Sequence, residues 1–200
     1  GEDTRAPSQA IQLLQQDVGH LDAHERRQVG MHFVPEESLG RGAVPSLSLA
    51  QNMLLTRSEA IAQSGWIDTN TLQAQAQKVI DRFNVKANGP QAAAQSLSGG
   101  NLQKFIVGRE IDAKPKVLLV SQPTWGVDVG AAAQIRAELL ALRDAGCAVL
   151  VVSEELDELF EICDRLQVIA HGKLSPSIAA GQATVAQMGE WMSGLWEAQA

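Results

Sequence analysis

The sequence predicts an α/β fold: a mostly parallel sheet with flanking helices, joined to a helical subdomain. Three apolar runs of strand length, 116–121, 147–152 and 165–170, alternate with segments of helical periodicity in the second half of the chain. Continuous apolar strands separated by helices are typical of a parallel sheet that is covered on both faces. The segment before them is mostly helical in pattern, which gives the predicted subdomain.

The bulk composition limits the function classes. The chain has 200 residues, a hydrophobic content of 45% and a formal net charge of −7, which suit one domain, or one domain with a subdomain. The acidic balance argues against a nucleic-acid-binding protein, which usually carries a basic patch. No apolar run reaches the roughly 18 residues of a membrane span. No signal peptide is visible, and because Gly1 is not a natural start we expect an excised piece of a longer protein.

Cysteine and histidine predict neither a disulfide framework nor a metal site. Cys147 and Cys163 both lie in apolar stretches, so we expect small buried thiols in a reducing compartment. The histidines have no metal-ligand spacing among themselves or with the cysteines. No bound metal is therefore expected from these residues.

The first half of the chain predicts short strands and helices. The expected elements are a strand over 11–18, a helix over 23–29, a strand over 31–34, a loop over 40–45, and helices over 46–65 and about 69–83. Asp22 and Glu25 have the spacing of a capping box, and Pro35 ends the second strand. Thr69 could cap the last of these helices. Its apolar face, at helical spacing, consists of Leu72, Val79, Ile80 and Phe83.

The second half predicts the alternation of helices and strands. The expected helices cover about 98–112, 131–144, 155–163 and 184–197. Thr184 and Gln187 have capping-box spacing at the start of the last helix. Its apolar stripe consists of Val185, Met188, Trp191, Met192, Leu195 and Trp196. We expect this stripe to dock on the body of the domain, and a partner or membrane surface is the alternative.

A glycine-rich loop, Leu97-Ser98-Gly99-Gly100-Asn101, opens the helix over 98–112. Unpaired backbone N–H groups and the dipole at a helix N-terminus favour an anion. The glycines would let the backbone approach a phosphate closely. An ordinary glycine-rich loop that caps a helix is the alternative for this motif alone.

Several blocks, in order along nearly the whole chain, resemble the second of two fused nucleotide-binding cassettes in an ABC importer ATPase of the simple-sugar and nucleoside type. Residues 33–37 and 40–52 resemble the Q-loop and the segment beyond it, 97–104 the signature, 122–130 Walker B running into the D-loop, and 153–158 the switch region. The resemblance implies a P-loop NTPase-like fold. The chain contains no G-x-x-x-x-G-K-[ST] motif, so we expect Walker A to lie upstream of this piece.

The resemblance also implies which residues meet ATP and Mg²⁺ in the parent protein. The implied cofactor-binding residues are Ser98, Gly99, Gly100, Asn101, Asp128, Ser121 and Glu36. Asp128 stands at the D-loop position and would reach across the cassette interface. Alternatively, it is a turn acid stabilised by the dipole of the following helix.

Four positions depart from the family pattern. Ser121 and Gln122 stand where Walker B normally ends in Asp-Glu, Glu154 stands where many cassettes have a switch His, and Glu36 replaces a Gln. Serine is a weaker magnesium partner than a carboxylate, and glutamine can hold a water but cannot take its proton. A carboxylate at 154 would repel a phosphate. The departures suggest that Gln122 and Glu154 occupy catalytic positions of a degenerate site, unless they are tolerated features of the subfamily.

The sequence therefore predicts part of an ATP-binding subunit of a sugar or nucleoside importer, inactive on its own, whose signature loop completes the site of an opposing cassette. Expected partners are the first cassette of the parent chain, membrane permease subunits and, indirectly, a substrate-binding protein. The expected location is the cytoplasmic face of the bacterial inner membrane. A structural module that binds no nucleotide, and a cassette protein acting on ribosomes or DNA, are the alternatives. The piece is expected to self-associate through an exposed sheet edge.

We expect four segments: a remnant of N-terminal strands with the Q-loop over 1–40, the helical subdomain over 41–112, the core over 113–182 and the C-terminal helix over 183–200. Lys104 and Arg109 are expected on a solvated or interface face of the signature helix.

Overall fold

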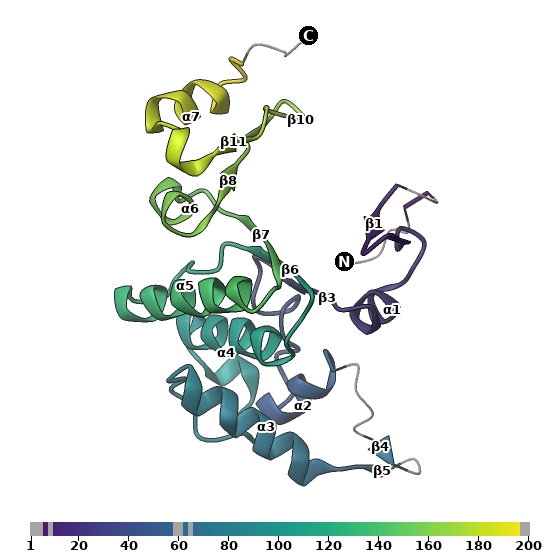
Figure 1. The fold of residues 1–200 in the computed structure, drawn as a ribbon. Helices are drawn as coiled ribbons and strands as arrows, with labels where there is room; N and C mark the ends of the chain where they lie inside the picture. Colours follow the sequence, from purple (N-terminus) through teal and green to yellow (C-terminus); the bar gives the residue numbers. More distant parts are fainter. Residues whose placement is uncertain (1–5, 8–9, 58–61, 64–65, 197–200) are drawn as a thin grey trace. The chain divides into compact units, whose positions relative to one another are not determined.

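The computed structural model describes residues 6–7, 10–57, 62–63 and 66–196 (Figure 1). The chain divides into two compact units, 1–152 and 153–200.

The first unit contains the helices and the main sheet. Its elements are β1 (Gln12–Leu13), β2 (Gln16–Asp17), α1 (Ala23–Gln28), β3 (Met31–Val34), α2 (Leu49–Leu54), β4 (Ala62–Gln63), β5 (Trp66–Ile67), α3 (Thr69–Arg82), the 3₁₀ turn Ala94–Ser96, α4 (Gly99–Asp112), β6 (Val117–Ser121), α5 (Val129–Asp144) and β7 (Ala148–Val152). The mixed α/β class and the parallel pairing are as the sequence predicts.

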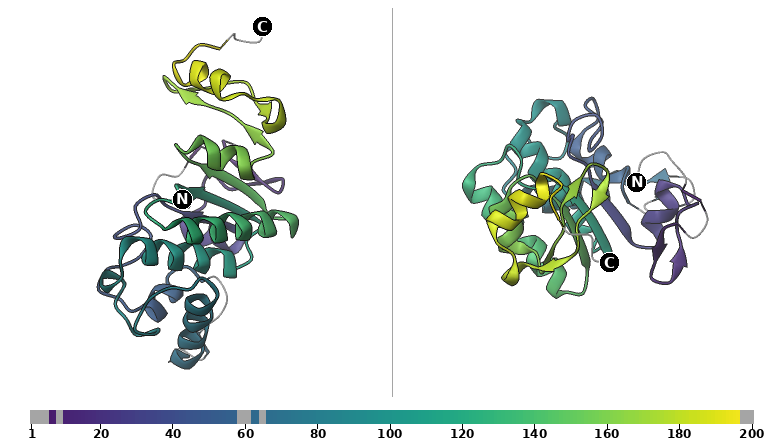
Figure 2. Two further views of the ribbon diagram at one scale, coloured as in Figure 1. Left: turned by 90° about the vertical axis from the view of Figure 1, so that its left-hand side faces the viewer. Right: turned by 90° about the horizontal axis from the view of Figure 1, so that it is seen from above.

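The main sheet is parallel, with the strand order β3-β6-β7. Helix α4 contacts β3, α5 contacts β7, and the two helices pack on each other. Figure 2 shows this layer of helices from two further sides. The residues of β6 that are buried, Leu118 and Val120, alternate with less buried ones, as expected for a strand with one face in a core.

Among the described residues the opposite face of this sheet is only partly covered, in contrast to the prediction of a sheet covered on both faces. Leu150 and Val152 of β7 are each 56% exposed, so the strand over 147–152 is not fully buried. β7 lies at one edge of the described sheet, and its alternate residues point away from the helices. Apolar composition on both faces of a strand does not by itself mean that both faces are covered.

The helical part of the first unit consists of α2, α3 and α4. Helix α3 packs on both α2 and α4, and the predicted apolar face of α3 is buried, as is Phe83 just after it. Its N-cap is Asp68 rather than Thr69, because the Asp68 carboxylate accepts hydrogen bonds from the N–H groups of Asn70 and Thr71. The capping box of Asp22 and Glu25 is present at α1, as predicted.

Two predicted elements of the first unit differ from the structure in type or length. The strand over 11–18 is a hairpin of β1 and β2, because Leu14 and Gln15 adopt left-handed backbone angles that turn the chain. The helix over 46–65 is present only as α2, which Ser48 caps. Within the same range, Ala62–Gln63 pairs with Trp66–Ile67 as strands, while 58–61 and 64–65 lie outside the described residues.

The second unit contains α6 (Leu156–Ile162), β8 (Arg165–Leu166), β9 (Ile169–Ala170), β10 (Lys173–Leu174), β11 (Ile178–Ala179), the 3₁₀ turn Ala180–Gln182 and α7 (Val185–Met192). The strand predicted over 165–170 is two short strands, and both pair antiparallel, β8 with β11 and β9 with β10. A turn at His171 and Gly172 joins β9 to β10. The parallel sheet therefore does not extend into this unit in the described residues.

The last helix, α7, is shorter than predicted and only partly docked. It ends at Met192, shortly before Gly194, which has a left-handed φ of 81°. Met188 and Trp191 are buried in a cluster with Leu166. Val185, Met192 and Leu195 are 60%, 54% and 69% exposed, so half of the predicted stripe faces solvent. Residue 197 lies outside the described part of the chain.

Cys147 is buried and Cys163 is half-buried, and both are free thiols. Burial raises the pKa of each thiol, which disfavours the reactive thiolate.

Candidate functional site

The glycine-rich loop of residues 97–101, hereafter the signature loop, opens α4 as predicted. Ser98 is the N-cap residue of this helix of 14 residues, and its side chain makes no capping hydrogen bond to the backbone. Ser98 and Gly99 are exposed. The loop therefore presents a hydroxyl and the first backbone N–H groups of a long helix to the surroundings, an arrangement that suits an anion.

The two glycines of the signature loop have different surroundings. A Cβ built at Gly99 meets no atom within 4 Å, whereas one at Gly100 would lie 2.6 Å from the carbonyl oxygen of Gly126. Gly100 therefore permits close packing of the signature loop against the turn before α5. Only Gly99 has the open space that an approaching phosphate requires.

We predict that Gly100→Ala destabilises the chain and that Gly99→Ala does not. The methyl group at 100 meets a backbone oxygen that cannot rotate away, and such overpacking costs about 1–3 kcal/mol. Urea denaturation followed by circular dichroism measures both variants. Equal midpoints for the two variants would contradict the packing role of Gly100.

The end of β6 carries Ser121 and Gln122. The Gln122 side chain is 93% hidden from solvent, its φ is 49°, and its backbone N–H donates to the Val152 oxygen at 2.7 Å. A non-glycine residue in the left-handed region carries strain of about 1–3 kcal/mol and often marks a functional position. No sequence pattern indicated this backbone conformation.

A hollow of about 650 Å³ next to this strand end brings two of the predicted residues together. It is lined by Phe33, Pro35, Glu36, Glu37, Arg41, Ser121 and Trp125. Glu36 and Ser121 are thus neighbours in one site, whereas Gln122 does not line it. Arg41 forms an ion pair with Glu37, with 3.2 Å between Nε and Oε2. The charged side chains of this hollow are two carboxylates and one guanidinium, and the resulting net negative charge disfavours a phosphate.

Asp128 is the N-cap of α5. Its Oδ1 accepts a hydrogen bond from the Ala131 N–H at 3.0 Å, and this backbone bond lowers the pKa of the carboxyl. The geometry agrees with the turn-acid alternative, because an acid at a helix N-terminus satisfies an unpaired donor. Its reach toward another cassette stays a prediction.

Glu154 belongs to the second unit and is exposed just before α6. Ser153 beside it accepts a hydrogen bond from the Glu155 N–H at 3.1 Å and donates to Glu158 at 3.0 Å. These two hydrogen bonds of the switch region therefore join residues of the second unit.

Gln103 connects three predicted motifs, although no sequence feature singled it out as a site residue. Its side chain is 2% exposed. Its Nε2 donates to the backbone oxygens of Gln122 at 3.1 Å and Pro123 at 3.2 Å, and its Oε1 accepts from the Ser38 hydroxyl. The buried amide thus joins the signature helix to the end of β6 and to the segment after the Q-loop.

The expectation of a solvated or interface face for Lys104 and Arg109 is wrong, because both side chains are buried. Lys104 Nζ donates to the Asn84 oxygen at 2.6 Å. Arg109 donates to the backbone oxygens of Asn52 at 3.1 Å and Gly42 at 2.9 Å, and also to Glu110. These bonds replace the hydration that a buried cation loses.

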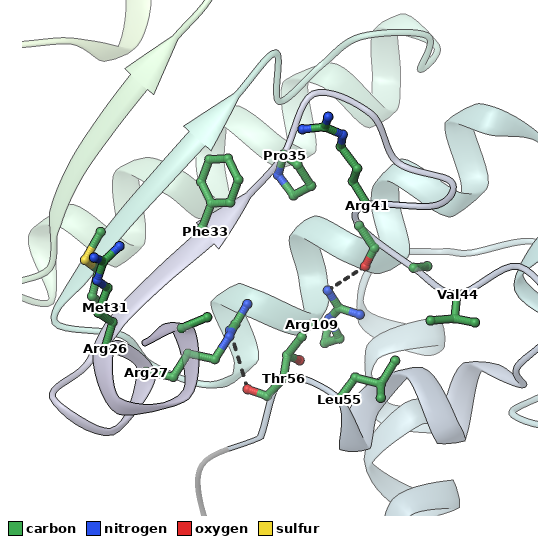
Figure 3. Close-up of a pocket in the computed structure, with 13 residues that line it drawn as sticks. Arg26, Arg27, Met31, Phe33, Pro35, Arg41, Val44, Leu55, Thr56 and Arg109 are labelled. Carbon is green, nitrogen blue, oxygen red and sulfur yellow. Dashed lines mark hydrogen bonds between the residues drawn. The ribbon is translucent and has the colours of Figure 1, made fainter. Parts of the chain in front are cut away.

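Glu110 is the centre of a buried ionic cluster. Its carboxylate is fully buried and contacts Arg109 at 2.9 Å, Arg27 at 2.7 Å and His32 at 2.8 Å. Figure 3 shows Arg27 and Arg109 on the wall of the adjacent pocket, reaching the oxygens of Thr56 and Gly42. The cluster ties α4 to α1 and β3, so it joins the helical part of the unit to the sheet.

The cluster makes stability depend on pH. Burial raises the pKa of Glu110, but Arg109, His32 and Arg27 outweigh burial and lower it from 4.5 to about 2. A carboxyl whose pKa is depressed in the folded state stabilises above its unfolded pKa and loses that contribution as pH falls through the folded pKa. We therefore predict a loss of about 3 kcal/mol between about pH 5 and pH 2. Urea midpoints across this range measure it, and an equal loss in Glu110→Gln would contradict this origin.

The described residues contain no group of histidine, cysteine and acidic side chains that could hold a metal ion. Within the same residues, no helix is long and apolar enough to span a membrane.

Comparisons with known proteins identify homologues over nearly the whole chain. It is 36% identical over 193 residues to the nucleoside import ATP-binding protein NupA of Lactococcus lactis, covering 96% of this chain and 38% of NupA. It is 37% identical over 157 residues to the ribose import ATP-binding protein RbsA of Bacillus licheniformis, covering 78% of this chain and 32% of RbsA. The guanosine import ATP-binding protein NupO of Bacillus subtilis is 31% identical over 198 residues, covering 98% of this chain and 39% of NupO. No family model matches the sequence.

Solved structures agree on the fold. The ATP-binding cassette MJ0796, in a dimeric post-hydrolysis state with ADP and Pi, matches with a TM-score of 0.68 and 18% identity, covering 84% of this chain and 72% of that one. The cassette MJ1267 matches with a TM-score of 0.68 and 17% identity, and the match covers 90% of this chain and 74% of that one.

The chain spans about two fifths of the length of the NupA and NupO proteins that it matches. Its fold is that of an ABC cassette, and its sequence blocks run in the order of that family. The chain therefore belongs to the ATP-binding cassette family, and its homologues include ATP-binding proteins of nucleoside and ribose import systems.

Proposed function

We propose that this chain works as part of the ATP-binding subunit of a sugar or nucleoside importer, and that its signature loop completes the ATP site of an opposing cassette. The names of the relatives support the importer class. A solved cassette of this fold is dimeric with bound ADP and Pi, which supports pairing with a second cassette. The partner in this proposal is the first cassette of the parent chain, with permease subunits at the cytoplasmic face of the membrane.

The observation that carries the proposal is the contrast between two surfaces of the first unit. The N-terminus of α4 exposes Ser98 and Gly99, with open space at Gly99. The hollow at Ser121 is lined by Glu36, Glu37 and Arg41, so its net charge is negative although Arg41 pairs with Glu37. A phosphate is favoured at the first surface by the N–H groups and the helix dipole, and disfavoured at the second by the carboxylates.

We further propose that the chain's own site is degenerate. Gln122 cannot act as a base at the position where the family has a catalytic Glu, and its side chain is buried away from the hollow. Ser121 offers Mg²⁺ a neutral oxygen in place of a carboxylate. MgATP, when bound by the opposing cassette, would supply the phosphates. The signature loop of this chain would contact these phosphates and orient them.

Fluorescence of Trp125 tests whether the signature loop meets nucleotide. Trp125 is 65% exposed and adjoins Gly126, against which Gly100 packs. We predict that MgATP changes the emission of Trp125 in the full-length protein and that Ser98→Arg abolishes the change.

The control is Trp125→Phe, which assigns the signal to this residue. A change that persists in Ser98→Arg would contradict the proposal, because the nucleotide would then affect Trp125 without the signature loop.

A further inference from the structure

Asn101 in the first turn of α4 has both ends of its side-chain amide engaged. Its Oδ1 accepts a hydrogen bond from the Lys86 backbone N–H at 2.8 Å, and its Nδ2 donates to the Ser98 hydroxyl at 2.8 Å. A backbone N–H can only donate, so the amide oxygen must face Lys86. The NH₂ group must therefore face Ser98, which fixes the direction of the second bond.

This bond sets the role of the Ser98 hydroxyl. Because the Ser98 oxygen accepts from Asn101, the proton of the hydroxyl is left to donate elsewhere. Within the described residues the bond to Asn101 is the one hydrogen bond that the Ser98 hydroxyl makes, and Ser98 is exposed. The hydroxyl is thus prepared as a donor toward a group outside the chain.

The segment that holds Asn101 is itself anchored. Lys104, one turn further along α4, donates to the Asn84 oxygen at 2.6 Å, and Asn84 has a left-handed φ of 47°. Asn101 and Lys104 therefore bind the same short connection, 84–86, from neighbouring turns of α4. The connection that accepts Lys104 therefore also keeps the Lys86 N–H in position for the Asn101 amide.

We propose that Asn101 is a positioning residue, which orients the Ser98 hydroxyl so that its proton is donated to a phosphate oxygen of the nucleotide held by the opposing cassette. The inference rests on the proposed function of the signature loop and adds to it a division of labour. Ser98 contacts the ligand, and Asn101 acts through Ser98.

Two substitutions separate this role from a structural one. Asn101→Ala removes both hydrogen bonds. Asn101→Asp keeps an acceptor for Lys86 but replaces the donor toward Ser98 with an acceptor, so the Ser98 proton turns inward. Asn70→Asp is the matched control, because Asn70, like Asn101, lies in the first turn of a helix, here α3, and the change adds the same charge.

The experiment measures MgATP hydrolysis by the full-length protein carrying Ser98→Ala, each Asn101 variant, and the double variant Ser98→Ala with Asn101→Ala. A hydrogen bond to a charged group corresponds to roughly a tenfold effect or more. We expect about a tenfold loss for Ser98→Ala, a smaller loss for Asn101→Ala, a larger one for Asn101→Asp, and none for Asn70→Asp. In the Ser98→Ala background, Asn101→Ala should cause no further loss, since it has no hydroxyl left to orient.

The outcomes distinguish the two proposals. No loss in Ser98→Ala would overturn the proposed function, and this inference with it. A loss in Ser98→Ala with normal activity in both Asn101 variants would overturn the positioning role alone. Losses that multiply in the double variant would also overturn it, because Asn101 would then act independently of Ser98. Should Asn101→Ala fail to fold, Asn101→Asp in the Ser98→Ala background gives the same test at raised salt, which screens the added charge.

Discussion

Glu110→Gln is expected to lower the free energy of unfolding by roughly 3–5 kcal/mol, the cost of breaking a buried ion pair by removing one partner. The carboxylate is fully buried, and Arg109 beside it is 2% exposed. Without the negative charge, Arg109 keeps its bonds to the oxygens of Asn52 and Gly42 but loses its counterion. Urea denaturation of this chain, followed by circular dichroism, measures the change.

Glu138→Gln is the matched control for this prediction. Glu138 pairs with Arg82, whose side chain is 43% exposed, and such surface pairs contribute about 0–1 kcal/mol. Similar losses in the two variants would mean that burial of the cluster at Glu110 adds nothing to stability.

Ser98→Arg is expected to lower MgATP hydrolysis by the full-length protein about 100-fold or more, beyond the loss of about tenfold expected for Ser98→Ala, because it removes the donor and also blocks the space for the phosphate. The Ser98 side chain is exposed at the N-terminus of α4, with open space at Gly99 beside it. A long arginine side chain would fill the space that the phosphate needs and would remove the hydroxyl donor. Steady-state phosphate release measures the rate.

Ser96→Arg is the control for the added charge and bulk. Ser96 is also exposed and precedes the signature loop, and its hydroxyl donates to the Ala93 oxygen rather than toward solvent. We expect activity near that of the wild type. Equal loss in Ser96→Arg and Ser98→Arg would show that the position of the arginine does not matter, against the proposed role of Ser98.

Most elements of the fold could be predicted from the sequence, because capping residues and apolar spacing act locally. The capping pair Asp22 and Glu25 and the buried face of α3 are examples. The prediction of which sheet faces are covered depended on tertiary context and was wrong. Leu150 and Val152 are apolar but exposed on a sheet face that is only partly covered, and nothing in the strand itself distinguishes a covered face from an open one.

The candidate site was only partly predictable for a similar reason. The signature loop could be identified, because glycines at a helix start have a local cause. Gln103 and Glu110 could not, because a polar residue in a helix is usually solvated, and their burial depends on distant partners such as Ser38 and His32. An unbroken run of buried residues from Leu102 to Ile111 makes α4 a central helix, and its polar members are satisfied internally.

In the function proposed above, this cassette serves the opposing site while its own site does not hydrolyse ATP. The most direct test is the rate of MgATP hydrolysis by the full-length protein with Gln122→Ala, measured beside the wild type and Ser98→Arg. The account predicts a rate close to that of the wild type for Gln122→Ala, and a rate near background for Ser98→Arg. A comparable loss in Gln122→Ala, with unchanged thermal unfolding, would contradict it, because Gln122 would then take part in the chemistry of its own site.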